Sequence, residues 1–165
     1  DGYQEINKIN VTVTLHGNTS SVDYDGTAHE IEGYVVDSIK IGEDDTTLYT
    51  ASDFELAEDA TAKASRTEAG KTDMGLTAAS FVNNNANFDT VTFVVTDGYQ
   101  EINKINVTVT LHGNTSSVDY DGTEHTVSGY VVDSIKIGDE TTTLYTENDF
   151  SLASGATASA SRKDQ

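Results

Sequence analysis

The sequence predicts an all-β protein made of antiparallel β-sandwich modules in tandem, and three observations support that prediction. Residues 1–66 return as residues 97–162 at a fixed offset of 96 residues, with 13 differences and no insertion or deletion. A period of this length matches a whole domain rather than a short solenoid unit. Apolar and polar residues alternate along most segments, as they do in half-buried strands. Each repeat holds about eight such short segments and no long helix, which favours an immunoglobulin-like sandwich over a β-grasp-like fold, the alternative.

The first half of the repeat contains four predicted strands. Residues 9–15 alternate Ile, Val, Val and Leu with Asn and Thr. Asp25-Gly26 then separates two alternating segments, and we expect a hairpin there because both residues tolerate positive φ. Residues 34–41 form the next predicted strand, which the polar turn at 42–45 ends.

The second half is predicted as short strands joined by turns. Residues 48–54 have the pattern of a single helical turn with Thr50 as its cap. Thr77–Phe81 is expected to form another helical turn, and residues 83–89 a loop. The remaining strands are expected at 54–56, 61–66, 71–76, 91–96 and 99–105, the last two as a second hairpin around Asp97-Gly98.

A change of alternation marks the module boundary. Ile105 begins an alternating apolar series to which Ile102 does not belong, and a strand changes its buried face only through a bulge, a twist or transfer to another core. We therefore expect residues 1–8 to be the final strand of a preceding repeat and residues 9–104 a complete module. Residues 105–165 are a truncated second copy without counterparts of residues 70–96, and we do not expect it to be a stable closed domain alone. No Gly, Ser or Pro linker separates the modules, which favours a stiff junction.

The composition excludes several classes of partner and chemistry. With 9 Lys and Arg against 28 Asp and Glu, the net charge is -19, so we expect neither nucleic acid nor anionic membrane as a partner. No apolar run approaches the ~20 residues that span a bilayer, so we expect no membrane insertion by this segment. The absence of cysteine excludes disulfides and thiol chemistry and suits an extracellular bacterial setting.

Histidines beside acidic residues are candidates for catalytic groups. His29 follows Asp25 by four residues, and His125 repeats that position in the second copy. No nucleophile stands at a recognisable spacing from either histidine. We therefore predict no catalytic residues and no enzymatic activity.

Two acidic segments are candidates for calcium sites. Asp23 and Asp25 resemble the opening of a calcium loop, but the remaining ligand positions are missing. Glu43, Asp44 and Asp45 form an acidic turn, of which the second copy keeps only two acids. We favour solvated turns at both places and predict no cofactor, with these five residues as the calcium candidates.

Exposed aromatic and histidine side chains present in both copies are the candidate ligand-binding residues. Aromatic residues of such a chain are more often core or turn anchors than a sugar-stacking platform. The candidates for contact with a glycan or matrix protein are Tyr24, His29, Tyr34, Tyr120, His125 and Tyr130.

Four motifs resemble those of the YDG/MBG-type repeats of bacterial surface proteins and large adhesins. They are Val22–Thr27 with His29, Leu48–Phe54, Ala69-Gly70 with Met74-Gly75-Leu76, and Val91–Gly98. The resemblance covers the full module and the available part of the second copy. It implies a secreted or wall-attached bacterial protein with tandem β-domains.

We expect a non-enzymatic module that acts as a stalk or spacer in an extended array and contacts neighbouring repeats. The alternative is an adhesive module that binds host glycan or matrix protein through many weak contacts.

Overall fold

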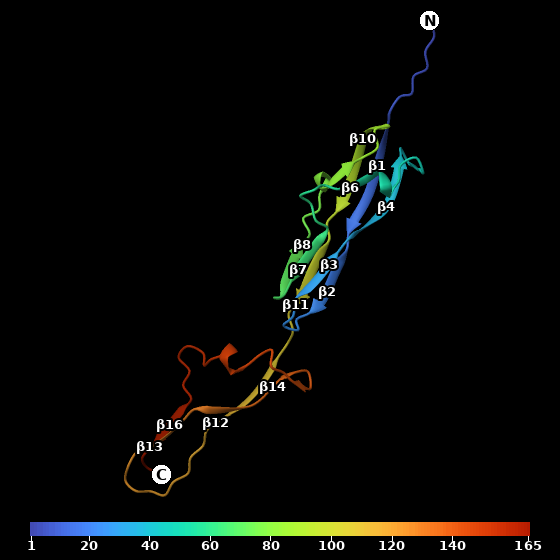
Figure 1. Ribbon diagram of the computed structural model, residues 1–165. Coiled ribbons are helices and arrows are strands. Elements are labelled where there is room, and N and C mark those ends of the chain that lie inside the picture. The colour runs from blue at the N-terminus through green and yellow to red at the C-terminus, as the bar shows by residue number, and fades with distance from the viewer. The chain divides into compact units, whose positions relative to one another are not determined.

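A computed structural model describes residues 1–165 and divides them into two compact units, which we call unit 1 (Asp1–Lys104) and unit 2 (Ile105–Gln165) (Figure 1). The division falls where the alternation changes between Ile102 and Ile105. The all-β class is confirmed, because the three helices are single 3-10 turns of three residues each. A β-grasp fold needs a helix packed across a sheet, so these short turns do not support that alternative. None of them has the length or apolar character to cross a bilayer.

Unit 1 contains eleven strands and two 3-10 turns. Its four sheets have the orders β10-β1-β4-β5, β2-β11-β8, β3-β7 and β6-β9. The strands are β1 (Ile9–Gly17), β2 (Thr19–Asp23), β3 (His29–Glu32), β4 (Tyr34–Ile41), β5 (Asp44–Asp45), β6 (Phe54–Leu56), β7 (Lys63–Arg66), β8 (Gly70–Asp73), β9 (Phe81–Asn83), β10 (Phe88–Thr96) and β11 (Tyr99–Asn103), and the turns are η1 (Ala51–Asp53) and η2 (Ala78–Ser80).

An aromatic core lies between the four-stranded sheet and the β6-β9 pair, which gives the predicted sandwich-like arrangement. The Phe54 ring of β6 meets the Phe93 ring of β10 with centroids 5.4 Å apart. Tyr49 is completely buried, and its hydroxyl donates to the Asp53 carbonyl at 3.1 Å and to Asn83 Oδ1 at 2.9 Å. Burial raises the pKa of this hydroxyl to about 12, with Asp53 adding to the effect. The inward side chains of β1 complete the core: Val11, Val13 and Leu15.

The first and last strands of unit 1 lie side by side and run parallel. β1 pairs with β10 from Ile9 opposite Phe88 to His16 opposite Thr96, and β2 pairs with β11 from Thr19 opposite Tyr99 onward. Both strand pairs pass from one sheet to the other at the same level. There Gly17 and Gly98 come so close that a Cβ on either would lie under 3.0 Å from the backbone of the other. Side chains larger than hydrogen do not fit at this crossing.

Both expected Asp-Gly hairpins are wrong. The strands that flank Asp25-Gly26 are β2 and β3, but β2 pairs with β11 and β3 pairs with β7. The strands that flank Asp97-Gly98 are β10 and β11, which pair with β1 and β2 in two different sheets. At each place the glycine turns the chain from one sheet to another, so the same local signal serves a crossover instead of a hairpin.

Other local predictions are confirmed. β4 spans residues 34–41 as expected, and Gly42 follows it with a φ of 63°. η1 has Thr50 as its N-cap, whose side chain accepts from the Ser52 amide at 3.3 Å. η2 lies inside the expected turn at 77–81. β9 was not predicted, and neither was the parallel pairing of the terminal strands.

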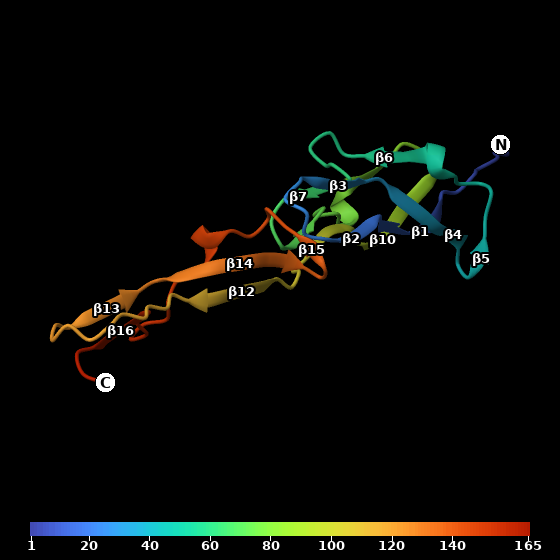
Figure 2. The ribbon, with the colours of Figure 1, turned by 90° about the horizontal axis from the view of Figure 1, so that it is seen from below.

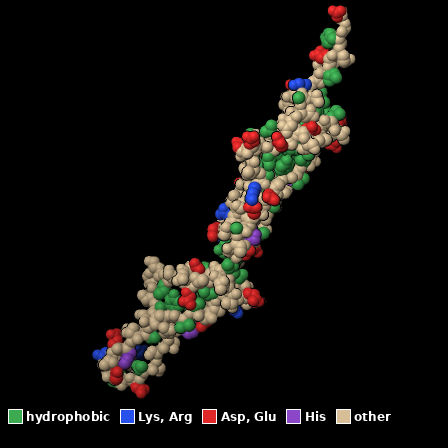
Figure 3. All heavy atoms as spheres, viewed as in Figure 1, with side chains coloured by type: hydrophobic (Ala, Val, Ile, Leu, Met, Phe, Trp, Pro, Cys, Tyr) green, Lys and Arg blue, Asp and Glu red, His purple; other side chains and the backbone are tan.

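Unit 2 repeats the strands of the first half of unit 1, among them the β12–β14 and β13–β16 pairs (Figure 2). More of its apolar side chains are exposed. Its elements are β12 (Thr108–Gly113), β13 (His125–Ser128), β14 (Tyr130–Ile137), β15 (Glu140–Thr141), η3 (Glu147–Asp149) and β16 (Ser159–Arg162). β12 and β14 pair in the register of β1 and β4, with the same irregularity one residue before the leucine. Leu15 is fully buried in unit 1, whereas its copy Leu111 is 46% exposed. Hydrophobic side chains accordingly reach the visible surface of unit 2 in Figure 3.

We predict opposite effects of one substitution at the two copies of the crossing glycine. Gly17→Ala places a Cβ 2.5 Å from the Gly98 amide nitrogen and is expected to lower the free energy of unfolding of unit 1 by about 1–3 kcal/mol. Gly113→Ala meets nothing within 4 Å and is expected to be neutral or to stabilise by up to about 1 kcal/mol. Amide hydrogen exchange, followed separately for each unit, measures both effects. Equal effects at the two positions would show that the crossing tolerates a methyl group.

Candidate functional site

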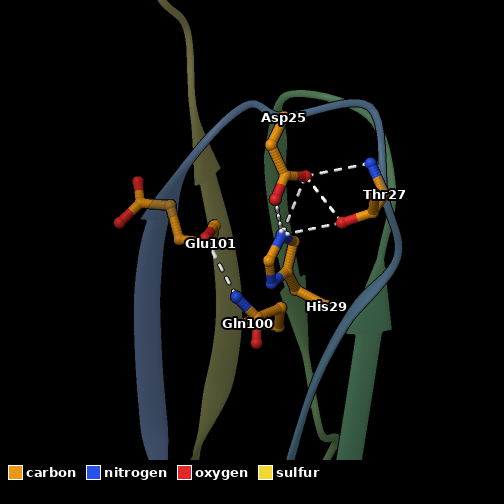
Figure 4. Close-up of polar contacts among 5 residues, drawn as sticks. All are labelled: Asp25, Thr27, His29, Gln100 and Glu101. Carbon is orange, nitrogen blue, oxygen red and sulfur yellow. Dashed lines mark hydrogen bonds and ion pairs between the residues drawn. The ribbon is translucent and has the colours of Figure 1, made fainter.

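A polar cluster that both copies of the repeat contain consists, in unit 1, of Asp25 and Thr27 on the loop between β2 and β3 and of His29, the first residue of β3 (Figure 4). Asp25 Oδ1 accepts from the Thr27 amide at 2.9 Å and from its hydroxyl at 2.7 Å, which is an Asx-type turn. His29 Nε2 lies 3.0 Å from both carboxylate oxygens of Asp25. Gly26 allows the turn with a φ of 77°. The cluster therefore fixes the loop by which the chain passes from one sheet to the other.

Hydrogen bonding strengthens the acid of this cluster. The Thr27 hydroxyl and amide, followed by His29, lower the pKa of Asp25 from 3.8 to about 2. The carboxylate is thus ionised throughout the physiological range. Its contribution to stability is complete above the ordinary pKa and is lost as the pH falls through about 2.

The geometry of the cluster does not match a Ser-His-Asp relay. Such a relay uses one ring nitrogen of histidine for the acid and the other for the nucleophile. Here the same atom, His29 Nε2, faces both the Asp25 carboxylate and the Thr27 hydroxyl, the latter at 3.3 Å. The hydroxyl donates to the carboxylate, so the arrangement acts as a lock on the turn.

A buried amide lies next to this cluster. Figure 4 shows the Gln100 side chain below the His29 ring, with its amide nitrogen directed at Glu101. Gln100 is completely buried; its Nε2 donates to the Glu101 carbonyl at 3.1 Å, and its Oε1 has no hydrogen-bond partner. Gln100 and Ile102 are the side chains with which β11 closes this end of the unit.

The same cluster forms in unit 2 from Asp121, Thr123 and His125. Asp121 Oδ1 accepts from the Thr123 amide at 2.9 Å and from its hydroxyl at 2.7 Å, and lies 2.9 Å from His125 Nε2. The Thr123 hydroxyl and amide, with His125, hold the pKa of Asp121 well below its ordinary range. No strand of the β11 type covers this copy, so the local sequence alone suffices to build the cluster.

The structure does not bring the candidate ligand-binding residues together into one surface. Tyr34 packs its ring edge-on against Phe81 at 5.1 Å, as part of the core. Its copy Tyr130 lies beside Phe150 at 6.5 Å. The backbone amide of Tyr24 donates to the Asn103 carbonyl at 3.0 Å, and no ring contact joins it to Tyr34. The side chain of the copy Tyr120 is exposed.

The calcium candidates also lie apart. The Asp23 carboxylate accepts from Asn103 Nδ2 at 3.2 Å, and Asp25 belongs to the turn cluster. Glu43 is exposed in the turn between β4 and β5, and Asp44 and Asp45 are exposed in β5. No group of three or more His, Cys, Asp or Glu side chains is placed to hold a metal ion. Figure 3 shows acidic side chains spread over the visible face of both units.

Two polar features of the structure were not predicted from the sequence. His16 Nδ1 pairs with Asp37 at 2.9 Å across β1 and β4, and His112 pairs with Asp133 in the same way at 2.8 Å. A groove of about 520 Å³ also lies in unit 2, lined by residues 116–121, 125–127 and 160–165. The groove could have been predicted from the repeat, because residues 115–119 copy β2, and β2 pairs with β11 in unit 1.

No protein-family model, no curated protein and no solved structure matches this chain. The resemblance to YDG/MBG-type repeats therefore rests on the sequence motifs alone and stays a prediction.

We predict that the Thr27 hydroxyl is the main cause of the lowered pKa of Asp25. Thr27→Val removes the 2.7 Å hydrogen bond and is expected to raise the pKa of Asp25 from about 2 toward 3.8. Carboxyl-carbon NMR titration measures this shift. Thr123→Val is the control, because it acts on Asp121 and is expected to leave Asp25 unchanged. An unchanged pKa of Asp25 in Thr27→Val would contradict the assignment.

Proposed function

We propose that this chain is part of a non-enzymatic spacer in an extended array of β-modules. The observation that carries the proposal is the parallel pairing of the first and last strands of unit 1. Parallel strands run in the same direction, so β1 and β10 both start at one end of the unit, where Ile9 lies opposite Phe88. β2 and β11 both finish at the other end, where Asp23 lies opposite Asn103. The chain therefore enters unit 1 at one end and leaves it at the opposite end. Each module therefore advances the chain by its full length.

The advance per module follows from strand geometry. From Ile9 to Asp23 the chain makes 14 residue steps, nearly all in β1 and β2. At about 3.3 Å per step, the module extends roughly 45 Å along the chain. A repeat of 96 residues thus adds a fixed length to the array, as a spacer requires.

The surface chemistry also supports a spacer. A net charge of -19 keeps neighbouring arrays apart and in solution. Neither unit assembles a relay or a group of metal ligands. The junction residues Asn103-Lys104-Ile105 include no Gly, Ser or Pro, which favours a short, stiff connection.

We place this spacer outside the cell, in a secreted or wall-attached bacterial protein. Support comes from the motifs that resemble bacterial surface repeats. Its partners in this proposal are neighbouring repeats of the same chain.

The adhesive alternative has weaker support. It needs a surface shared by both copies, and Tyr34 and Tyr130 both lie against phenylalanine rings. The exposed turn with its histidine, at His29 and His125, is the part of that surface that both copies keep. Binding to a glycan and matrix-protein array that weakens when His29 and His125 become Ala would favour adhesion over the spacer.

The spacer proposal predicts a fixed length increment. Chains with three, five and seven copies of residues 9–104 are expected to lengthen by roughly 45 Å per copy, because each module is crossed from end to end. Electron microscopy or small-angle X-ray scattering measures the increment. Inserting a flexible Gly-Ser segment after Lys104 serves as the control, since it should broaden the distribution of lengths without shortening the module. Compact particles whose length does not grow with copy number would rule out the spacer.

A further inference from the structure

The first and last strands of unit 1 carry any tension that acts along the chain. The chain enters at Ile9, where β1 begins, and leaves after Asn103, where β11 ends. A pull on the chain draws β1 and β2 toward the entry end and β10 and β11 toward the exit end. These strands are direct neighbours, with seven residue pairs between β1 and β10 and five between β2 and β11. Load therefore passes from the entry strands to the exit strands across their shared backbone hydrogen bonds.

Core side chains on the paired strands oppose a slide of one strand along the other. Val13 of β1 lies opposite Phe93 of β10, and Leu15 lies opposite Val95. Val13 and Leu15 are completely buried, and Phe93 and Val95 pack against the same core. A shift of β1 by one residue would turn its buried side chains to the outer face, because side chains alternate along a strand. The first step of a slide therefore costs apolar burial as well as hydrogen bonds.

The crossing of the strands has no room for a shifted register. Gly17 and Gly98 meet there, and a Cβ on Gly98 would lie 2.4 Å from the Asn18 carbonyl oxygen. A pull on the entry strands brings Asn18 to the place of Gly17, and a pull on the exit strands brings Asp97 to the place of Gly98. Both incoming residues carry a Cβ that the crossing does not admit. The crossing thus blocks a slide by one residue.

Asp97 ties the exit strands to the rest of the unit at the same crossing. It lies between β10 and β11, and its carboxylate accepts from the amides of Gly75 and Leu76, both at 2.9 Å. The Met74 amide donates to the Gly98 carbonyl at 2.8 Å. Movement of β10 and β11 toward the exit end has to break these bonds. Two of them have a carboxylate as acceptor and are therefore stronger than bonds between neutral groups.

We propose that unit 1 is a force-bearing clamp, which keeps its length under tension because the β1–β10 and β2–β11 pairs are loaded in shear. The inference rests on the proposed spacer function, since only a module held at both ends in an array carries tension. In shear the hydrogen bonds of both pairs have to fail together, whereas strands pulled apart from one end lose them one at a time. The resistance is therefore directional and belongs to a pull from the entry end to the exit end.

Single-molecule pulling of the full chain in two directions tests the clamp, with handles on introduced cysteines, since the chain has none of its own. Lys8→Cys with Lys104→Cys loads unit 1 from entry to exit and leaves unit 2 outside the load path. Lys8→Cys with Asn87→Cys loads the adjacent beginnings of β1 and β10 and opens that pair from one end. All three residues are exposed, so the handles do not disturb the core. At equal loading rate the first direction is expected to need roughly threefold more force or higher.

Equal rupture forces in the two directions overturn the clamp. That result would leave the spacer itself standing, because the length increment of the spacer is measured without load. A length that does not grow with copy number would instead remove the spacer, whatever the rupture forces are.

A matched pair of substitutions tests the part of Asp97 in the clamp. Asp97→Asn weakens the bonds to Gly75 and Leu76 and is expected to raise the rate of unfolding at constant force roughly fivefold or more in the entry-to-exit direction. Asp89→Asn removes the same charge from an exposed position of β10 and is expected to change that rate less than about twofold. In the direction that opens β1 from β10, Asp97→Asn is also expected to change the rate less than about twofold, because opening begins at the far end of the pair. Equal rates for the two variants in the entry-to-exit direction refute the clamp at the crossing.

Discussion

The close contact between Gly17 and Gly98 is the constraint on which the rest of unit 1 depends. At this point the first and last strands, still side by side, leave one sheet and enter another. A Cβ on Gly17 would lie 2.5 Å from the Gly98 amide nitrogen, so only two glycines allow the strands to cross at this distance. Because of this crossing, the paired strands β1 and β10 of one sheet continue as the paired strands β2 and β11 of another sheet. It also makes the chain enter at one end and leave at the other.

This topology determines how a pull along the chain would act on the proposed spacer. Tension between the two ends draws β1–β2 and β10–β11 past each other along their length. Their backbone hydrogen bonds are then loaded together, in shear, instead of being opened one after another. The aromatic core beside the same strands resists the slide, because Phe93 of β10 is packed against Phe54 and Phe81. A module built in this way suits a spacer that must keep its length under load.

What could be predicted from the sequence was local, and what could not was the choice of strand partners. The strand at 34–41, the Thr50 cap and the parity change after Ile102 each depend on residues close together in the chain. The two Asp-Gly hairpins failed because β2 and β10 find better partners far away in sequence. The Asp25–His29 contact was considered from its spacing, but the part of Thr27 in it was not. Tyr34 was proposed as a binding residue because its contact with Phe81, 47 residues away, leaves no local mark.

A comparison of the two units distinguishes the structure that the local sequence forms from the structure that depends on the closing strands, β10 and β11. β12 and β14 keep the register of β1 and β4, and the Asp121 turn keeps the hydrogen bonds of the Asp25 turn, so neither needs β10 or β11. Burial does need them, since Leu15 is fully covered whereas Leu111 is not. The closing strands therefore contribute mainly apolar burial and backbone pairing to strands whose local register is already formed.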